Sequence, residues 1–121
     1  MKYLILIYGN QVDWDGFSAA DKHAFGRDHL ALTDSLAESG ELVLSEGLAD
    51  PELATCVSVR DGQTVTTDGP YAEAKEHLAG LYLVECDSIE RAIEQAARVP
   101  DARSGAQVEV RPVLDFSGWE M

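Results

Sequence analysis

Apolar residues follow two spacings along this chain, and the spacing predicts where strands and helices lie. Runs rich in β-branched and aromatic residues predict strands. These runs cover residues 2–8, 42–48, 80–86 and 107–113. Apolar positions three and four residues apart predict two amphipathic helices. The helices cover residues 18–39 and 88–100. The longer helix has an apolar stripe of Phe25, Leu32 and Leu36.

Capping residues set the expected helix ends. Ser18 precedes the long helix with Asp21 three residues later, a variant of the capping box. Gly40 is placed to end this helix in the left-handed conformation. Ser88 caps the second helix, and Pro100 is expected to end it. Residues 9–17 are expected to form a polar loop.

A hairpin is predicted in the middle of the chain. Residues 54–60 and 63–67 flank Asp61-Gly62, a dipeptide typical of tight hairpin turns. The order of elements is therefore β-α-β-β-α-β with an extra central hairpin. Two helices on one face of an antiparallel sheet form an α+β, ferredoxin-like arrangement. At 121 residues, we expect one domain over residues 1–121.

Two of the predicted strands are apolar on both faces. Residues 3–8 and 81–84 lack the alternation of apolar and polar positions that a half-exposed sheet shows. Helices cover only one face, so a second copy of the same sheet is the simplest cover for the other. The sequence therefore predicts a homodimer. The alternative is a C-terminal tail that folds back, with Phe116 and Trp119 over the sheet.

Charge and cysteine content narrow the functional classes. The chain has 22 acidic and 9 basic residues, a formal net charge of −13. Such a surface repels phosphate groups, so we expect neither nucleic-acid nor membrane binding. The longest apolar run is too short to cross a bilayer, and no export signal is evident. A cytoplasmic protein with reduced Cys56 and Cys86 is expected, since neither cysteine belongs to a CxxC motif.

One segment combines a sharp turn with charged side chains. A tight turn is predicted at Asp68-Gly69-Pro70-Tyr71, and Glu73 and Lys75 follow it. Polar groups held at the end of a strand are typical of small-molecule sites. Asp68 is a candidate catalytic carboxylate, or else it hydrogen-bonds its own turn. Glu73 and Lys75 are candidate ligand-binding residues, or else a solvated charge pair.

His29 is the main catalytic candidate. Its position between Phe25 and Leu32 places it on the apolar stripe of the long helix. Partial burial favours the neutral imidazole that a general base needs. The alternative is a core histidine bonded to a backbone carbonyl or a buried carboxylate. Further candidate ligand-binding residues are Glu46, Tyr71 and Tyr82.

Other kinds of site lack support in the sequence. His77 lies four residues after Glu73 and is expected to form an exposed pair with it on a short helix. No histidine or cysteine spacing suggests a metal site, and no cofactor motif is present.

Several motifs together resemble the YCII-related domain family, specifically its DGPF-type branch. The resemblance covers nearly the whole chain, with matching motifs at residues 1–9, Glu46-Gly47-Leu48, 59–62, 67–76, 78–84, 97–100 and 108–112. Tyr71 stands where the name of the branch has Phe. The resemblance implies a dimeric α+β barrel of ferredoxin-like subunits. It also implies a site centred on a His/Asp pair, with Arg27-Asp28-His29-Leu30 as the histidine segment. In those relatives the aspartate lies near an Asp-Pro pair. The order here is Pro100-Asp101, so the second member is not assigned.

Two functions fit these observations. The first is a cofactor-independent lyase or isomerase in which His29 moves a proton on a small molecule. The second is a non-catalytic dimeric binding or accessory protein, in which the Asp68–Tyr71 turn has a structural role. A polar-lined pocket beside His29 would favour the first, and a filled apolar core there would favour the second.

Overall fold

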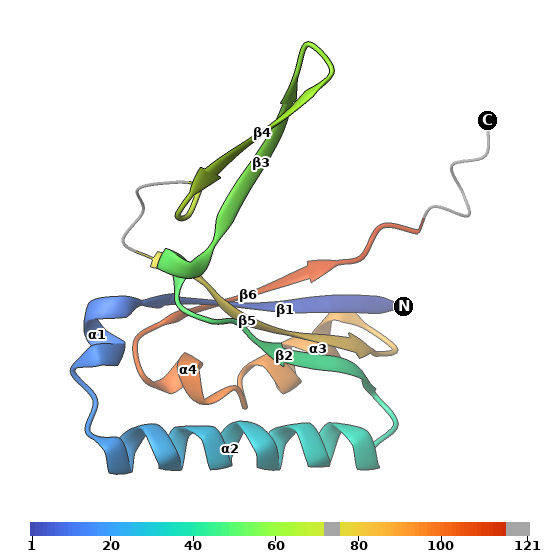
Figure 1. Ribbon diagram of the computed structural model, residues 1–121. Coiled ribbons are helices and arrows are strands. Elements are labelled where there is room, and N and C mark those ends of the chain that lie inside the picture. Colours follow the sequence, from blue (N-terminus) through green and yellow to red (C-terminus); the bar gives the residue numbers. More distant parts are fainter. Residues whose placement is uncertain (72–75, 116–121) are drawn as a thin grey trace.

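The computed structural model describes residues 1–71 and 76–115, without the side chains of residues 11 and 12. Its strands are β1 (Lys2–Asn10), β2 (Leu42–Gly47), β3 (Thr55–Arg60), β4 (Gln63–Asp68), β5 (Glu76–Glu85) and β6 (Gln107–Pro112). Its helices are α1 (Gln11–Asp15), α2 (Ala19–Glu38), η1 (Pro51–Leu53), α3 (Ile89–Ala96) and α4 (Pro100–Arg103). Figure 1 shows the arrangement, with α2 running beneath the main sheet.

The main sheet has four strands in the order β2-β5-β1-β6, and every neighbouring pair is antiparallel. The two central strands are β1 and β5, the most apolar runs of the sequence. Together with the order of helices and strands, this confirms the predicted α+β, ferredoxin-like arrangement. The strand β5 begins at Glu76, earlier than the predicted 80–86, so Glu76 and His77 lie on a strand rather than a helix.

The hydrophobic core lies between this sheet and the helices. Alternate residues of β1 and β5 point toward α2 and α3, as expected for a strand with period two. The buried core comprises Tyr3, Ile5, Ile7, Leu32, Leu36, Tyr82, Val84, Cys86, Ala92, Ala96 and Val99. Leu32 and Leu36 come from the predicted stripe of α2, and Phe25 and His29 extend that stripe as half-buried residues.

The predicted caps are present, while two predicted boundaries are wrong. Ser18 and Ser88 accept hydrogen bonds from backbone N–H groups three residues ahead, at 3.0 and 3.2 Å. Gly40 has a φ of +79° just after α2. The polar stretch 9–17 is not wholly a loop, because β1 continues to Asn10 and α1 follows it directly. Pro100 does not end a helix but begins one, since its fixed φ suits the first position of α4.

The predicted central hairpin forms a sheet of its own, β3 with β4, which we call the arm. Asp61 and Gly62 have φ values of 51° and 76° at its tip, as a tight hairpin turn requires. All residues of β4 are exposed, and Val57 and Val59 of β3 are 65% and 69% exposed. The arm extends from the side of the main sheet opposite α2 (Figure 1).

The face of the main sheet away from the helices is apolar at its centre. Cross-strand pairing puts Leu4 opposite Leu83 and Leu6 opposite Leu81 on that face. Leu44 of β2 lies beside Leu83 and is 41% exposed. Leu6 is 8% exposed and so already covered, whereas Leu4, Leu81 and Leu83 are half-buried, and α2, α3 and α4 lie on the other side of the sheet (Figure 1). Phe116 and Trp119, the alternative cover, lie outside the described residues.

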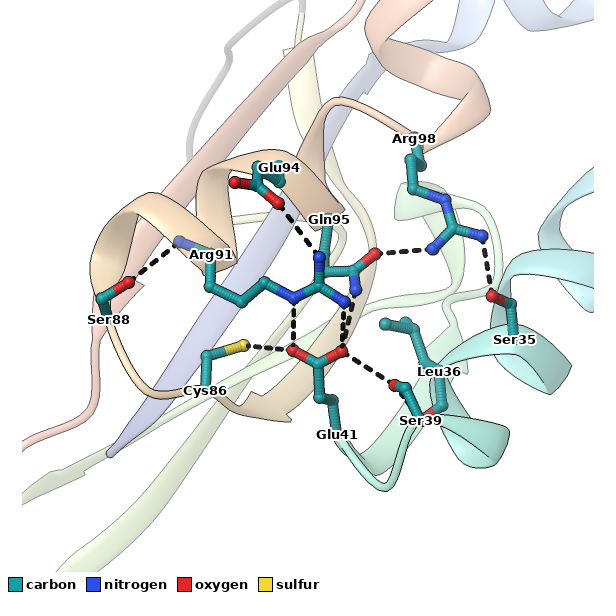
Figure 2. A network of polar contacts seen from close by, with 10 residues as sticks. All are labelled: Ser35, Leu36, Ser39, Glu41, Cys86, Ser88, Arg91, Glu94, Gln95 and Arg98. Carbon is teal, nitrogen blue, oxygen red and sulfur yellow. Dashed lines mark hydrogen bonds and ion pairs between the residues drawn. The ribbon is translucent and has the colours of Figure 1, made fainter.

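A polar network joins the end of α2 to β5 and α3 (Figure 2). Glu41 accepts two hydrogen bonds from Arg91, both at 2.9 Å, and one from the Gln95 amide, at 2.9 Å. The Ser39 hydroxyl and the Cys86 thiol also donate to it, at 2.8 and 3.3 Å. The Arg91 guanidinium, helped by these other donors, lowers the pKa of Glu41 to about 2 although burial opposes the shift.

Candidate functional site

A cavity of about 400 Å³ lies between α2 and one end of the main sheet. Its apolar lining includes Ile7, Trp14, Phe25, Leu48 and Leu78. Its polar lining includes Lys22, His29, Ser45, Glu46, His77, Tyr82 and Asp101. A mostly apolar hollow with a few convergent polar groups is typical of a small-molecule site.

His29 lies at the centre of the polar lining, and both of its ring nitrogens have partners. Nε2 is 2.6 Å from Oδ1 of Asp101, and Nδ1 is 2.6 Å from the hydroxyl of Tyr82. An ionised carboxylate only accepts hydrogen bonds, so Nε2 carries a hydrogen and donates it to Asp101. In the neutral ring, Nδ1 then accepts the hydrogen of the Tyr82 hydroxyl. Aspartate, imidazole and phenol therefore form one hydrogen-bonded chain.

The phenol end of this chain is enclosed. Tyr82 is 2% exposed, and burial raises the pKa of its hydroxyl above the ordinary value, with a smaller raising effect from the Asp101 charge. Hydrogen bonds with Thr33 and Ser45 act in the opposite direction. The Tyr82 hydroxyl also lies 3.3 Å from the backbone carbonyl of His29, to which Thr33 donates at 3.0 Å.

Asp101 reaches His29 because of the way the chain folds after α3. Val99 is buried and precedes Pro100, which starts α4, so the next residue points back toward α2. The Asp101 side chain is 12% exposed and that of His29 is 26% exposed. Burial strengthens an interaction between such groups relative to one in water. The sequence alone leaves Asp101 unassigned, because Pro100 and Asp101 stand in the reverse of the expected order; the structure shows Asp101 as the partner of His29.

Aromatic rings form one wall of the cavity. Trp14 lies 5.9 Å from Phe25, which packs edge-on against His29 at 5.2 Å between ring centroids. Lys22 holds its ammonium 5.2 Å above the Trp14 ring. This geometry is a cation–π contact, and it keeps a positive charge at the wall of the cavity.

The other candidate residues are divided between the cavity and the surface. Glu46 lines the cavity together with Tyr82 and His77, and Glu73, the expected partner of His77, lies outside the described residues. Asp68 is exposed at the end of β4, opposite Thr55 in the arm, and is not among the lining residues. Tyr71 is 95% exposed. Glu73 and Lys75 lie outside the described residues.

Among residues 1–71 and 76–115, no group of three histidine, cysteine or acidic side chains could hold a metal ion. The helices of the described part are also too short or too polar to cross a membrane. Both cysteines are free thiols, Cys86 buried and Cys56 partly buried.

Comparison with known proteins gives a family match and a similar protein. The model of the YCII-related domain matches residues 1–117. An uncharacterised protein of Rhizobium meliloti (strain 1021) is 30% identical over 122 residues, an alignment that covers 100% of this chain and 98% of that protein.

Proposed function

The chain belongs to the YCII-related domain family, and from that premise we propose that it is a cofactor-independent enzyme of lyase or isomerase type. The observation that carries this proposal is the His29–Asp101 pair, with 2.6 Å between Nε2 and Oδ1, in the lining of a cavity. An imidazole beside a partly buried carboxylate can take a proton and hold the resulting charge. Proton transfer of this kind needs no bound cofactor.

The cavity lining suggests the type of ligand. Trp14 and Phe25 provide flat apolar surfaces, while Lys22 supplies a positive charge in a protein with a net charge of −13. A small, flat molecule with a carbonyl or acidic hydroxyl group suits such a lining. Carbonyl compounds and hydroxylated aromatic acids are therefore the first compounds to test.

We also propose that the chain belongs to the DGPF-type branch, acts in the cytoplasm and pairs as a dimeric α+β barrel. The branch assignment depends on the segment Asp68-Gly69-Pro70-Tyr71. The apolar sheet face supports pairing, because Leu44 and its neighbours need cover from water. The arm adds support, because residues 55–67 carry one cation, Arg60, and one anion, Asp61, in an otherwise acidic chain. Sedimentation at micromolar protein concentration tests this assembly, and a single monomeric species would refute it.

The catalytic proposal is tested by deuterium incorporation. Candidate carbon acids are incubated with the protein in D₂O, and loss of their proton signals is followed by NMR. We expect His29→Gln to slow any accelerated exchange by about 10²- to 10⁴-fold, the usual contribution of a general base. His23→Gln is the control, because His23 is exposed on the same helix and is not among the lining residues. Equal rates for the two variants would refute the proposal.

A non-catalytic binding or accessory protein is the second candidate. The exposed arm and the 95% exposure of Tyr71 favour it, since both offer apolar surface to a partner. In that case Asp68→Asn would lower the melting temperature or weaken dimerisation, while ligands of the cavity would bind unchanged. Exchange catalysis that depends on His29 would exclude this second role as the sole function.

A further inference from the structure

His29 has no ring nitrogen open to a ligand. Nε2 is held by Asp101 and Nδ1 by the Tyr82 hydroxyl, each at 2.6 Å. At such distances both contacts are strong hydrogen bonds. A nitrogen in such a bond can take a proton from a ligand only after its partner has left. A direct role for His29 as the base is therefore blocked in this arrangement.

We propose that Tyr82 exchanges the proton with the ligand, and that His29 and Asp101 act behind it as the second and third members of a chain. This inference rests on the acid–base function proposed above. Tyr82 is 2% exposed but is among the residues that line the cavity, and we place the ligand against that small accessible part. The order carboxylate, imidazole, hydroxyl is that of a catalytic triad, which is recognised by geometry and roles rather than by sequence position. Here the hydroxyl is a phenol.

The proton moves in a balanced sequence. The Tyr82 hydroxyl passes its hydrogen to Nδ1 of His29 as its oxygen takes a proton from a C–H or O–H group of the ligand. The electron pair of the broken bond stays on the ligand, which becomes an anion. The imidazolium that forms is stabilised by Asp101 through Nε2–H. The reverse flow returns the proton to another ligand atom or to its leaving group, and no electrons are gained or lost.

The surroundings of Tyr82 suit both charge states of His29. With the ring neutral, the hydroxyl donates to Nδ1 at 2.6 Å. With the ring protonated, Nδ1–H donates to the phenol oxygen, and the hydroxyl hydrogen turns to the backbone carbonyl of His29, 3.3 Å away. Thr33 and Ser45 lie beside the same oxygen. Buried polar groups thus keep partners throughout, which avoids the cost of an unpaired group.

Tyr82→Phe keeps the ring and removes only the hydroxyl, so it separates two mechanisms. If Tyr82 carries the proton, ligand exchange falls at least about 100-fold, a loss typical of a removed acid–base group. If His29 acts directly, the substitution frees Nδ1, and exchange stays the same or rises. Tyr3→Phe is the matched control. Tyr3 is 5% exposed on β1, and its hydroxyl contacts the sulfur of Met1 at 3.6 Å rather than the cavity.

A spectroscopic measurement on the ligand-free protein accompanies the kinetics. In ¹⁵N NMR of labelled histidine, the signal of unprotonated Nδ1 in His29 should move downfield in Tyr82→Phe, because its hydrogen-bond donor is gone. It should stay in place in Tyr3→Phe. If the Nδ1 signal does not move in Tyr82→Phe, the proposed proton chain from Tyr82 to His29 and Asp101 is wrong. If that variant does not fold, 3-fluorotyrosine at position 82 makes the phenol more acidic, so the signal and the exchange rate should both change. No change in either would overturn the inference.

The outcomes separate this inference from the function it rests on. If His29→Gln abolishes exchange and Tyr82→Phe does not, only the role of Tyr82 fails. If neither variant alters exchange, or if the wild-type protein accelerates none, the proposed function fails and the proton chain falls with it. The proton chain is supported if both His29→Gln and Tyr82→Phe lose exchange, and if the NMR signal moves in Tyr82→Phe but not in Tyr3→Phe.

Discussion

Glu41 is expected to contribute more to stability than its place near the surface suggests. Its folded-state pKa is about 2 against an ordinary 4.5, a difference of 2.5 units. At about 1.36 kcal/mol per pKa unit, that gives an upper limit of about 3 kcal/mol. The Arg91 side chain is 43% exposed, so solvent screening reduces the electrostatic part to about 1 kcal/mol. In Glu41→Gln the amide has one acceptor oxygen where the carboxylate has two, so some of the five donors around position 41 lose their acceptor, which adds about 1 kcal/mol.

We therefore expect Glu41→Gln to lower the free energy of unfolding by about 2 kcal/mol, and Tm by about 8 °C. Urea denaturation followed by circular dichroism measures the first quantity. Glu94→Gln is the control, because Glu94 binds the same Arg91 at 3.0 Å but is 66% exposed. Its loss should cost less than about 0.5 kcal/mol.

The pH dependence of the free energy of unfolding provides a second test of the role of Glu41. Because folding lowers the pKa of Glu41, its contribution is complete above about pH 5 and is lost as the pH falls toward 2. The stability gap between the wild type and Glu41→Gln should shrink over that range. A gap that does not change with pH, or one no larger than that of Glu94→Gln, would refute this reasoning.

Three further predictions concern other parts of the fold. Burial raises the pKa of the Cys86 thiol to about 11, with further raising effects from its hydrogen bond to Glu41 and from the Glu41 charge. The thiol should therefore react slowly with iodoacetamide at pH 8, and it should react faster in Glu41→Gln. Gly80→Ala should lower the free energy of unfolding, measured by urea denaturation, by about 1 to 3 kcal/mol, because a Cβ at position 80 would lie 3.0 Å from a backbone carbonyl of β2. Gly47→Ala is the control and should cost less, because a Cβ at position 47 meets no atom within 4 Å. Leu83→Asp should shift sedimentation toward the monomer if the open sheet face is the dimer interface, and an unchanged dimer would place the interface elsewhere.

Local features of the sequence predicted much of the fold. Helix caps at Ser18 and Ser88 and the turn at Asp61-Gly62 depend on residues within a few positions of each other, so the sequence carries them directly. The spacing of Leu32 and Leu36 likewise placed His29 on the face of α2 that meets the sheet.

Features that depend on distant contacts were harder to predict. Asp101 and His29 are 72 positions apart, and only the path of the chain through α4 brings them together. A proline such as Pro100 is found both after the end of a helix and at the first position of one, and the sequence alone does not decide between these two places. Asp68 was an attractive candidate because of its turn, but pairing with Thr55 holds it on the arm.

The arm and its flanks lie between β2, which ends at Gly47, and β5, which begins at Glu76. Leu48 donates its backbone N–H to the carbonyl of Ala79 at 2.8 Å, and Gly47 faces Gly80 across the strands. The length of the stretch between β2 and β5 can change while the pairing of Gly47 with Gly80 keeps the two strands in register. Because Pro51 from that stretch and His77 from the start of β5 also line the cavity, relatives that share the sheet and helices could differ in what they admit through this part of the chain.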